Sequence, residues 1–406
     1  MSSPLSLLAR NPDFRRLYLS ELVVFGADWF IMVPLLVQLT DLTGSGVLGA
    51  LVMTVDTGLN ALLLPYSGTV VDRVNRRTVM ITANLAALAA SLLLFLIQGP
   101  DTAWVALLAM AAVAIAKSFY TPAAQAALPN VVDAADLPAA NALAGGAWGV
   151  MVVVGASVGG VVSGFAGPYA CFAIAGAGLL LASLLTSRIR RPLQAPAPDG
   201  PPPHPFAAIR EALRFIGGSS RLRALITVKS AVGLGNGVIA VFPLVVASYG
   251  VGPAGVGILF AVRGAAVLAG PLITRRLLDH STWLLPGLAV SMGVYGLAYA
   301  TAAFVPWFPL LVALVFVAHF AGGTNWMLSN FALQGAVPDM LRGRVFATDL
   351  MLTTIAISIS QLGVAAVVDH VNPRHIMVAS GTVTLLYACG WVVLMVVAPL
   401  LRARSA

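Results

Sequence analysis

The stretch GTVVDRVNRR, residues 68–77, decides the fold, because it places charged residues between two long apolar runs. It holds one aspartate, three arginines and a turn-forming asparagine, which are too many polar groups for a membrane core. We therefore predict a short aqueous loop between two membrane spans. The positive-inside rule places such an arginine-rich loop in the cytoplasm, so this loop sets the expected orientation of the whole chain.

The composition is that of a membrane protein. The 406 residues are 59% hydrophobic and 9% charged, with a mean hydropathy of +0.93, whereas a soluble protein carries about 25% charged residues. The net charge of +8 comes from basic residues in loops between apolar runs, so no nucleic-acid partner is expected. Two cysteines, Cys171 and Cys389, predict no disulfide framework. The first residues lack a secretory signal and are expected to stay in the cytoplasm.

Apolar runs of about 20 residues, the length that crosses a bilayer, number twelve. The first six cover residues 17–40, 47–71, 78–98, 103–127, 140–165 and 168–187. The second six cover residues 222–249, 254–278, 282–304, 308–335, 345–369 and 374–400. All but four of the 23 Lys and Arg residues then fall on the cytoplasmic side, which supports twelve spans with both termini in the cytoplasm.

These spans predict an all-α membrane protein with two six-helix bundles, residues 1–187 and 222–406. Residues 188–221 between them predict a cytoplasmic linker, in which a Pro-rich segment precedes an amphipathic helix, FAAIREALRFI, on the inner membrane surface. The halves also look like repeats, because four pairs match at one constant spacing: Gly26 with Gly235, Pro34 with Pro243, Gln125 with Gln334, and Pro129 with Pro338. Parallel six-span repeats with a binding site between them near the midplane are a known transporter plan.

The loop resembles the signature loop of the major facilitator superfamily. That signature runs glycine, three residues, aspartate, arginine, one residue, glycine, arginine, then lysine or arginine, and the matching residues here are Gly68, Asp72, Arg73, Arg76 and Arg77. Asn75 replaces the second glycine, and because asparagine tolerates a left-handed backbone, the turn is expected to survive. The resemblance implies two helical bundles and no enzymatic activity.

Three further stretches resemble the bacterial twelve-span drug and siderophore exporters, which include the enterobactin exporter group. They are RNPDFRRLYLSELVVFGADWF near the start, FYTPAAQAALPNVV after the fourth span and VPDMLRGRVFA before the eleventh. The resemblance implies a monomeric exporter in the cell inner (plasma) membrane. Span five departs from the exporters' pattern by lacking their proline, but it keeps four glycines that allow close helix packing: Gly155, Gly159, Gly160 and Gly164.

Charged residues inside the spans are the first candidates for function, since each costs about 2.5 to 3.5 kcal/mol at the bilayer centre. Asp28 in span one is the leading candidate for proton coupling, and a hydrogen-bonded packing role is its alternative. Asp56 is a second proton-coupling candidate. Asp56 and Lys117 are expected to form a salt bridge, which is either functional or purely structural.

The remaining polar residues of the spans predict a substrate cavity. Arg263 is a candidate for binding an anionic group, with a structural pairing as the equal alternative. Lys229 and Glu21 are expected to reach the inner interface. His319 is more often a hydrogen-bonded core residue than a proton carrier. The cavity candidates are Asn60, Lys117, Arg263, His319, Asn325, Trp326, Ser329 and Asn330.

Motifs of enzymes are missing from the sequence. There is no phosphate-binding loop ending in Gly-Lys-Ser/Thr, no His-Glu-x-x-His and no cluster of metal ligands, so no cofactor and no metal are expected. Gly155 to Gly159 formally matches G-x-S-x-G, but it lies in the middle of a predicted helix.

The sequence therefore predicts a secondary transporter, a proton-coupled exporter of a small amphiphilic drug, siderophore or metabolite. Import of a metabolite, flipping of a lipid or lysolipid, and ligand sensing without transport remain open. The resemblance implies that the loop is a cytoplasmic gate, built from Gly68, Asp72, Arg73, Arg76, Arg77 and Asp349. Asp72 is expected to meet the helix start near Val345, and Asp349 to pair with Arg73 or Arg76. A contact with span four is expected to be missing, because Thr121 replaces the usual acid.

Overall fold

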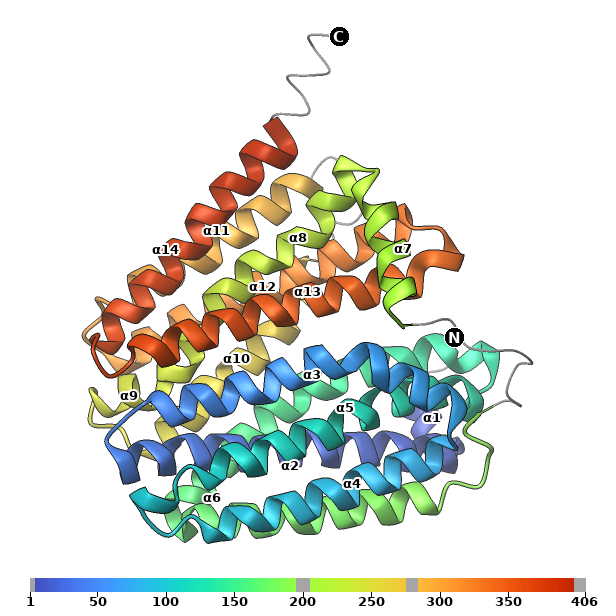
Figure 1. The fold of residues 1–406 in the computed structure, drawn as a ribbon, viewed down its shortest axis with the longest axis horizontal. Coiled ribbons are helices and arrows are strands. Elements are labelled where there is room, and N and C mark those ends of the chain that lie inside the picture. The colour runs from blue at the N-terminus through green and yellow to red at the C-terminus, as the bar shows by residue number, and fades with distance from the viewer. Residues whose placement is uncertain (1–3, 195–204, 275–283, 398–406) are drawn as a thin grey trace. The chain divides into compact units, whose positions relative to one another are not determined.

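The computed structural model of the protein describes residues 4–194, 205–274 and 284–397 (Figure 1). In these residues all regular structure is helical, and no strand occurs among them. The predicted all-α class is thereby confirmed. Many large apolar side chains of the described helices are exposed, as lipid-facing surfaces require, and examples are Leu62, Phe165, Leu272, Val290 and Leu386.

The helices of the first half of the chain are α1 (Pro4–Arg10), α2 (Pro12–Thr43), α3 (Val47–Arg73), α4 (Arg76–Leu92), α5 (Val105–Val131) and α6 (Leu137–Ser187). Short 3-10 helices lie beside them: η1 (Leu93–Leu96), η2 (Pro100–Thr102) and η3 (Ala134–Asp136). The second half contains α7 (Pro205–Gly217), α8 (Ser220–Gly235), the 3-10 helix η4 (Asn236–Val241), α9 (Phe242–Ala247), α10 (Pro253–Thr274), α11 (Leu284–Ala302), α12 (Phe308–Ala336), α13 (Asp339–Val367), α14 (Pro373–Val392) and the π-helical turn η7 (Val393–Val397).

Eleven of the described helical segments are long and apolar enough to cross a membrane, and one of them holds two spans. Helix α6 is interrupted at Gly167, whose φ of 78° and ψ of 171° are not helical. A positive φ is accessible to glycine, and Pro168 after it cannot donate a backbone hydrogen bond into the preceding turn. The kink separates the predicted spans 140–165 and 168–187, so the described helices account for twelve spans.

The seventh span is broken in its middle. Helix α8 ends at Gly235, η4 follows, and α9 completes the span. The break coincides with a close approach to α13, because a Cβ on Gly237 would lie 2.6 Å from the backbone oxygen of Ser360. The Ser360 hydroxyl accepts a hydrogen bond of 2.9 Å from the Gly237 N–H, which compensates for the lost helical bonding.

The chain divides into two compact units. The first contains Met1–Gly44, Leu62–Pro202 and Gly252–Ala261, and the second contains Ser45–Ala61, Pro203–Val251 and Val262–Ala406. The main division falls inside the predicted linker. Two segments depart from the predicted halves, because the start of α3 belongs to the second unit and the start of α10 to the first.

Specific contacts explain both departures. In the second unit, the Ser45 hydroxyl donates to Asp369 at 2.6 Å and the Thr57 hydroxyl donates to the side-chain oxygen of Gln361 at 2.6 Å, so the start of α3 is fastened beside α13. In the first unit, a Cβ on Gly257 of α10 would lie 2.7 Å from the Ala156 carbonyl oxygen of α6. Such backbone approach requires glycine.

The glycines of span five have the predicted packing role at two of four positions, Gly155 and Gly160, because a Cβ on Gly159 would make only an ordinary contact. A Cβ on Gly155 would lie 2.9 Å from Cβ of Trp29, one on Gly159 would lie 3.5 Å from Cα of Phe30, and one on Gly160 would lie 3.0 Å from Cα of Gly257. Gly164 has open space around its Cα, so close packing does not require it.

Helix α7 is the predicted amphipathic helix, but its apolar face packs on protein. Ala212 and Ile216 are buried in a core cluster together with Leu222 of α8 and Val345 of α13. The polar face pairs Glu211 with Arg344 of α13. Ala212 and Ile216 are therefore covered by α8 and α13, and the position of α7 on the inner membrane surface stays a prediction.

Candidate functional site

The first unit contains an ion pair within its apolar spans. Nζ of Lys117 on α5 lies 2.8 Å from Oδ2 of Asp28 on α2, and the two side chains are 15% and 19% exposed. Two opposite charges in contact offset much of the cost that either would carry alone in the membrane. The leading proton-coupling candidate therefore contacts the lysine that is expected to pair with Asp56. The Asp56–Lys117 pair stays a prediction.

A buried hydroxyl cluster follows Lys117 along α5. The hydroxyl of Ser20 lies 3.0 Å from that of Tyr120 and 3.0 Å from that of Thr186, and it joins α2, α5 and α6. All three residues are at most 1% exposed. Glu21 beside them is only 8% exposed, so the expectation that it reaches the interface is wrong for this conformation.

The signature loop, residues 68–77, is mostly helical. Helix α3 continues to Arg73 and α4 begins at Arg76, so only Val74 and Asn75 connect them. Asn75 has a φ of −54° and a ψ of 115°, which corrects the expected left-handed turn. Its side-chain oxygen instead accepts from the N–H groups of Arg77 and Thr78, at 3.0 and 3.4 Å, and caps α4. The side chain of Asp72 lies outside the described residues.

Arg76 makes the span-four contact that we expected to be missing. Its Nη1 donates to the carbonyl oxygen of Ala126 at the end of α5, at 2.8 Å, and to that of Leu193 at 3.1 Å. Arg77 similarly donates to the carbonyl oxygen of Arg191 at 3.3 Å. A backbone carbonyl near a helix C-terminus carries partial negative charge. It can therefore accept the hydrogen bond from Arg76 in place of the usual acid, which Thr121 replaces in this chain.

Asp13 holds the first residues after α6, a contact that sequence reasoning missed. The backbone N–H groups of Arg190 and Arg191 donate to its two carboxylate oxygens, each at 3.0 Å. Together with Arg76 and Arg77, this carboxylate fastens residues 190–193 to the start of α2, the start of α4 and the last turns of α5. Backbone partners of this kind leave no mark on residue type, so the pattern of charges alone does not predict them.

The second unit contains a more deeply buried ion pair. Lys229 of α8 bonds the carboxylate of Asp349 on α13, and both residues are 2% exposed. Nζ of Lys229 also donates to Oδ1 of Asn330 at 2.7 Å and lies 4.9 Å from the ring centroid of Trp326. The expectation that Lys229 reaches the interface is therefore wrong. Asp349 is bonded to Lys229, and its expected pairing with Arg73 or Arg76 of the signature loop stays a prediction.

The polar stretch of α12 divides between the core and the surface of its unit. Nδ2 of Asn325 donates to the Ser291 hydroxyl of α11 at 2.9 Å, and the Ser329 hydroxyl donates to the Trp326 carbonyl oxygen at 3.1 Å. Asn325 and Ser329 are 1% and 0% exposed, so in this conformation neither is presented as a cavity wall. Trp326 is 39% exposed and Asn330 is half-buried.

His319 lies in a buried aromatic cluster with two tyrosines of α11. Its Nε2 lies 2.7 Å from the hydroxyl of Tyr299, and its ring contacts that of Tyr295 edge-on, with centroids 5.5 Å apart. All three residues are at most 2% exposed, as expected for a hydrogen-bonded core histidine. Arg263 of α10 lies within electrostatic reach of both tyrosines. Its role toward an anionic substrate stays a prediction.

Asp56 and Asn60 lie one turn apart on α3, in the segment that belongs to the second unit. Both are half-buried. Thr57 between them is bonded to Gln361, so this turn of α3 is held against α13. Their roles in proton coupling and in the cavity wall stay predictions.

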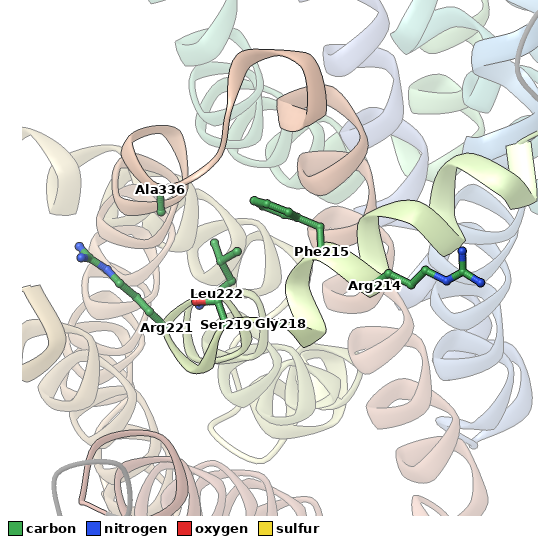
Figure 2. Close-up of a pocket in the computed structure, with 7 residues that line it drawn as sticks. All are labelled: Arg214, Phe215, Gly218, Ser219, Arg221, Leu222 and Ala336. Carbon is green, nitrogen blue, oxygen red and sulfur yellow. The ribbon is translucent and has the colours of Figure 1, made fainter. Parts of the chain in front are cut away.

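A hollow of about 570 Å³ lies in the second unit, where α7 meets α8. Figure 2 shows its lining residues: Arg214, Phe215, Gly218, Ser219, Arg221, Leu222 and Ala336. The two guanidinium groups point away from each other, so they do not converge on one ligand. None of the predicted site residues lines this hollow.

The sequence model of the Major Facilitator Superfamily matches residues 18–360. The chain is 26% identical over 362 residues to the "Enterobactin exporter EntS" of Salmonella typhimurium (strain LT2), which covers 84% of this chain and 82% of the relative. It is 25% identical over 359 residues to the protein of the same name from Shigella boydii serotype 4, with the same coverage.

Solved structures agree with this fold. A POT family transporter in complex with a thioalcohol-conjugated peptide superposes with a TM-score of 0.78 at 12% identity, covering 94% of this chain and 95% of the other. A bacterial homologue of the human lysosomal transporter Spinster, in an inward-facing and unoccupied conformation, gives a TM-score of 0.75 at 16% identity, covering 94% and 96%. At these identities the likeness shows the fold alone.

Proposed function

Because the chain belongs to the Major Facilitator Superfamily and is a multi-pass membrane transporter, not an enzyme, we propose that it is a proton-coupled exporter of a small amphiphilic compound. The two bundles would alternate in exposing a central site to either side of the membrane. Export is supported by the similarity to enterobactin exporters. We further propose a monomer with both termini and the linker, residues 188–221, in the cytoplasm of a bacterial cell.

The Asp28–Lys117 ion pair is the observation that carries this proposal. Placing a charged acid and a charged base within membrane spans costs free energy. Such residues are therefore functional-site hypotheses by default, and here the two lie at hydrogen-bonding distance. When Asp28 takes up a proton, its attraction to Lys117 is lost and the contact between α2 and α5 weakens. Substrate binding that favours one protonation state is in turn affected by the proton, since linkage acts in both directions.

We also propose that the signature loop is part of the cytoplasmic gate, as the superfamily resemblance implies. The hydrogen bonds of Arg76 to Ala126 and Leu193 support a role in fastening α4 to α5 and to the chain after α6. Asp72 and Arg73 remain candidates for contacts that form in another conformation. Asp349 can take part in such a contact only by leaving Lys229 or by using its second oxygen.

Transport in proteoliposomes tests the function. Vesicles that contain the purified protein and are acidic inside should accumulate an exported compound, with a catecholate siderophore and a lipophilic dye as first probes. Accumulation should collapse when the pH gradient is dissipated. Equal uptake with and without the gradient, or accumulation only when the gradient is reversed in vesicles of the same orientation, contradicts proton-coupled export.

A further inference from the structure

The second unit holds an ammonium group in a cage of three acceptors. Nζ of Lys229 bonds the Asp349 carboxylate, lies 2.7 Å from Oδ1 of Asn330, and lies 4.9 Å from the centroid of the Trp326 ring. We call Asp349, Asn330 and Trp326 the cation cage. A carboxylate, an amide oxygen and an indole face are the groups that recognise an organic cation, because each presents negative charge density to it.

The cation cage contains one buried acceptor atom that has no hydrogen-bond partner within the described residues. Oδ1 of Asp349 is buried and forms no hydrogen bond within the described residues, while Oδ2 holds Lys229. A buried carboxylate oxygen normally finds a donor, so an orphaned one marks a place where a partner is still to come. The rim of the cage reaches the surface of the unit, because Trp326 is 39% exposed and Asn330 is half-buried.

We propose that the cation cage binds the positively charged group of a substrate, and that Lys229 is its built-in occupant between transport cycles. The inference rests on the proposed function and deepens it, because it gives the transported amphiphile a charge class. The cation would lie on Oδ1 of Asp349, and the apolar part of the molecule would lie against the exposed side of Trp326. The four-carbon stem of Lys229 lets its amine withdraw without movement of α8.

Binding of a cation has a consequence for the proton on Lys229. Two positive charges at one buried carboxylate repel each other, and this repulsion favours the uncharged amine. The substrate cation and the Lys229 ammonium paired with Asp349 become the substrate cation paired with Asp349, the neutral Lys229 amine and one proton released to water. Charge balances in this step. One proton therefore leaves for each cation that enters, which is the ratio of an electroneutral antiporter.

Three other titratable groups on the elements packed against α8 have their own partners. Arg344 of α13 pairs with Glu211 of α7, His319 of α12 bonds Tyr299 of α11, and Tyr387 of α14 donates to the Thr227 carbonyl oxygen. The amine linked directly to Asp349 is that of Lys229. The released proton is therefore assigned to Lys229.

Proton release on binding tests the proposal. The full-length protein in lipid nanodiscs, in weakly buffered solution, is titrated with benzyltrimethylammonium, whose own charge does not change with pH. Calorimetry gives the bound cation and a pH indicator gives the released protons. The wild type should release about one proton per bound cation. Lys229→Arg keeps the ion pair but cannot release a proton, so it should release none and bind about tenfold more weakly.

Two further variants separate the cage from general effects. Asp349→Asn should abolish binding, and Trp326→Leu should weaken it. Trp307→Leu is the matched control, because Trp307 is 70% exposed outside the cage, and it should leave binding and proton release unchanged. A wild type that does not bind the cation, that binds it without releasing a proton, or a Lys229→Arg variant that releases as many protons, overturns the proposal.

Failure of this inference is distinguishable from failure of the proposed function. Proton-driven export of a neutral or anionic compound, without binding of the cation, contradicts the cation-cage proposal but agrees with the proposed exporter function. Cation binding with proton release, but without pH-driven transport in vesicles, agrees with the cation-cage proposal and contradicts the proposed exporter function.

Discussion

Asp28 and Lys117 neutralise each other between α2 and α5, with 2.8 Å between Oδ2 and Nζ. The two side chains are 19% and 15% exposed, so water screens the pair only in part. This contact links a charged residue of span one to one of span four within a single unit. In the proposed mechanism, the response of this unit to protons acts through this pair of atoms.

Removal of one partner should destabilise the first unit more than removal of both. Lys117→Met removes the ammonium group that contacts Asp28 in an apolar setting, which costs about 3 to 5 kcal/mol for a buried pair and less here because of partial exposure. The double variant Asp28→Leu/Lys117→Met should recover most of the loss. Denaturant unfolding in mixed micelles measures both. A double variant no more stable than the single one shows that the pair is not what holds the contact.

Arg76 should matter more for stability than its neighbour Arg73. Arg76→Ala removes two hydrogen bonds from a charged donor to the carbonyl oxygens of Ala126 and Leu193, a loss of about 1.5 to 3 kcal/mol for each bond to a charged group. The side chain of Arg73 is exposed, so Arg73→Ala should change the unfolding free energy by less than about 0.5 kcal/mol. Thermal unfolding compares them, and equal shifts in Tm speak against the Arg76 contacts.

Loss of the Asp349 carboxylate should lower the free energy of unfolding, in addition to any effect on gating. Asp349→Ala leaves the charge of Lys229 buried with Asn330 and Trp326 but without a carboxylate, so we expect a loss of about 3 to 5 kcal/mol. Lys229→Met/Asp349→Leu should restore stability, because no unpaired charge remains. Unfolding of the two variants side by side is the measurement. If Asp349→Ala unfolds like the wild type, the ion pair with Lys229 is not formed in the membrane.

The break in the seventh span predicts that alanine substitution of two nearby glycines, Gly237 and Gly363, has very different effects on stability. A Cβ on Gly237 would lie 2.6 Å from the Ser360 carbonyl oxygen, so Gly237→Ala should cost about 1 to 3 kcal/mol through overpacking. Gly363 on the partner helix α13 has open space, so Gly363→Ala should be neutral or stabilising by up to about 1 kcal/mol. Expression level and Tm report both. Equal effects rule out close packing at the break.

Much of the fold follows from apolar runs and loop charges, because lipid imposes both on the sequence. The Gly167–Pro168 pair marks the division of α6, and the glycines of span five mark the helix contacts they permit. The exchange of the starts of α3 and α10 between the units does not follow from the sequence. Apolar length fixes where a span lies but carries no information about which neighbours its outer half contacts.

The depth of a residue along its span predicts the contact between Asp28 and Lys117. Counted from the inner ends of their predicted spans, Asp28 and Lys117 lie about 16 and 15 Å deep, whereas Asp56 lies about 22 Å deep, at about 1.5 Å per residue. Equal depth favours the observed contact between Asp28 and Lys117, and the Asp56–Lys117 pair stays a prediction. The bonds of Arg76 and Asp13 to backbone groups lay beyond such reasoning, because every residue type offers a carbonyl and nearly every one an N–H.

Proton-driven transport by Asp28→Asn measures the central claim most directly. The asparagine keeps the shape of the side chain but cannot take up a proton, and Asp101→Asn, at an exposed position before α5, is the matched control. In proteoliposomes we predict that Asp28→Asn loses accumulation driven by a pH gradient while retaining counterflow exchange of the same probe, and that Asp101→Asn retains both. Wild-type accumulation by Asp28→Asn under the gradient would contradict proton coupling through the Asp28–Lys117 pair.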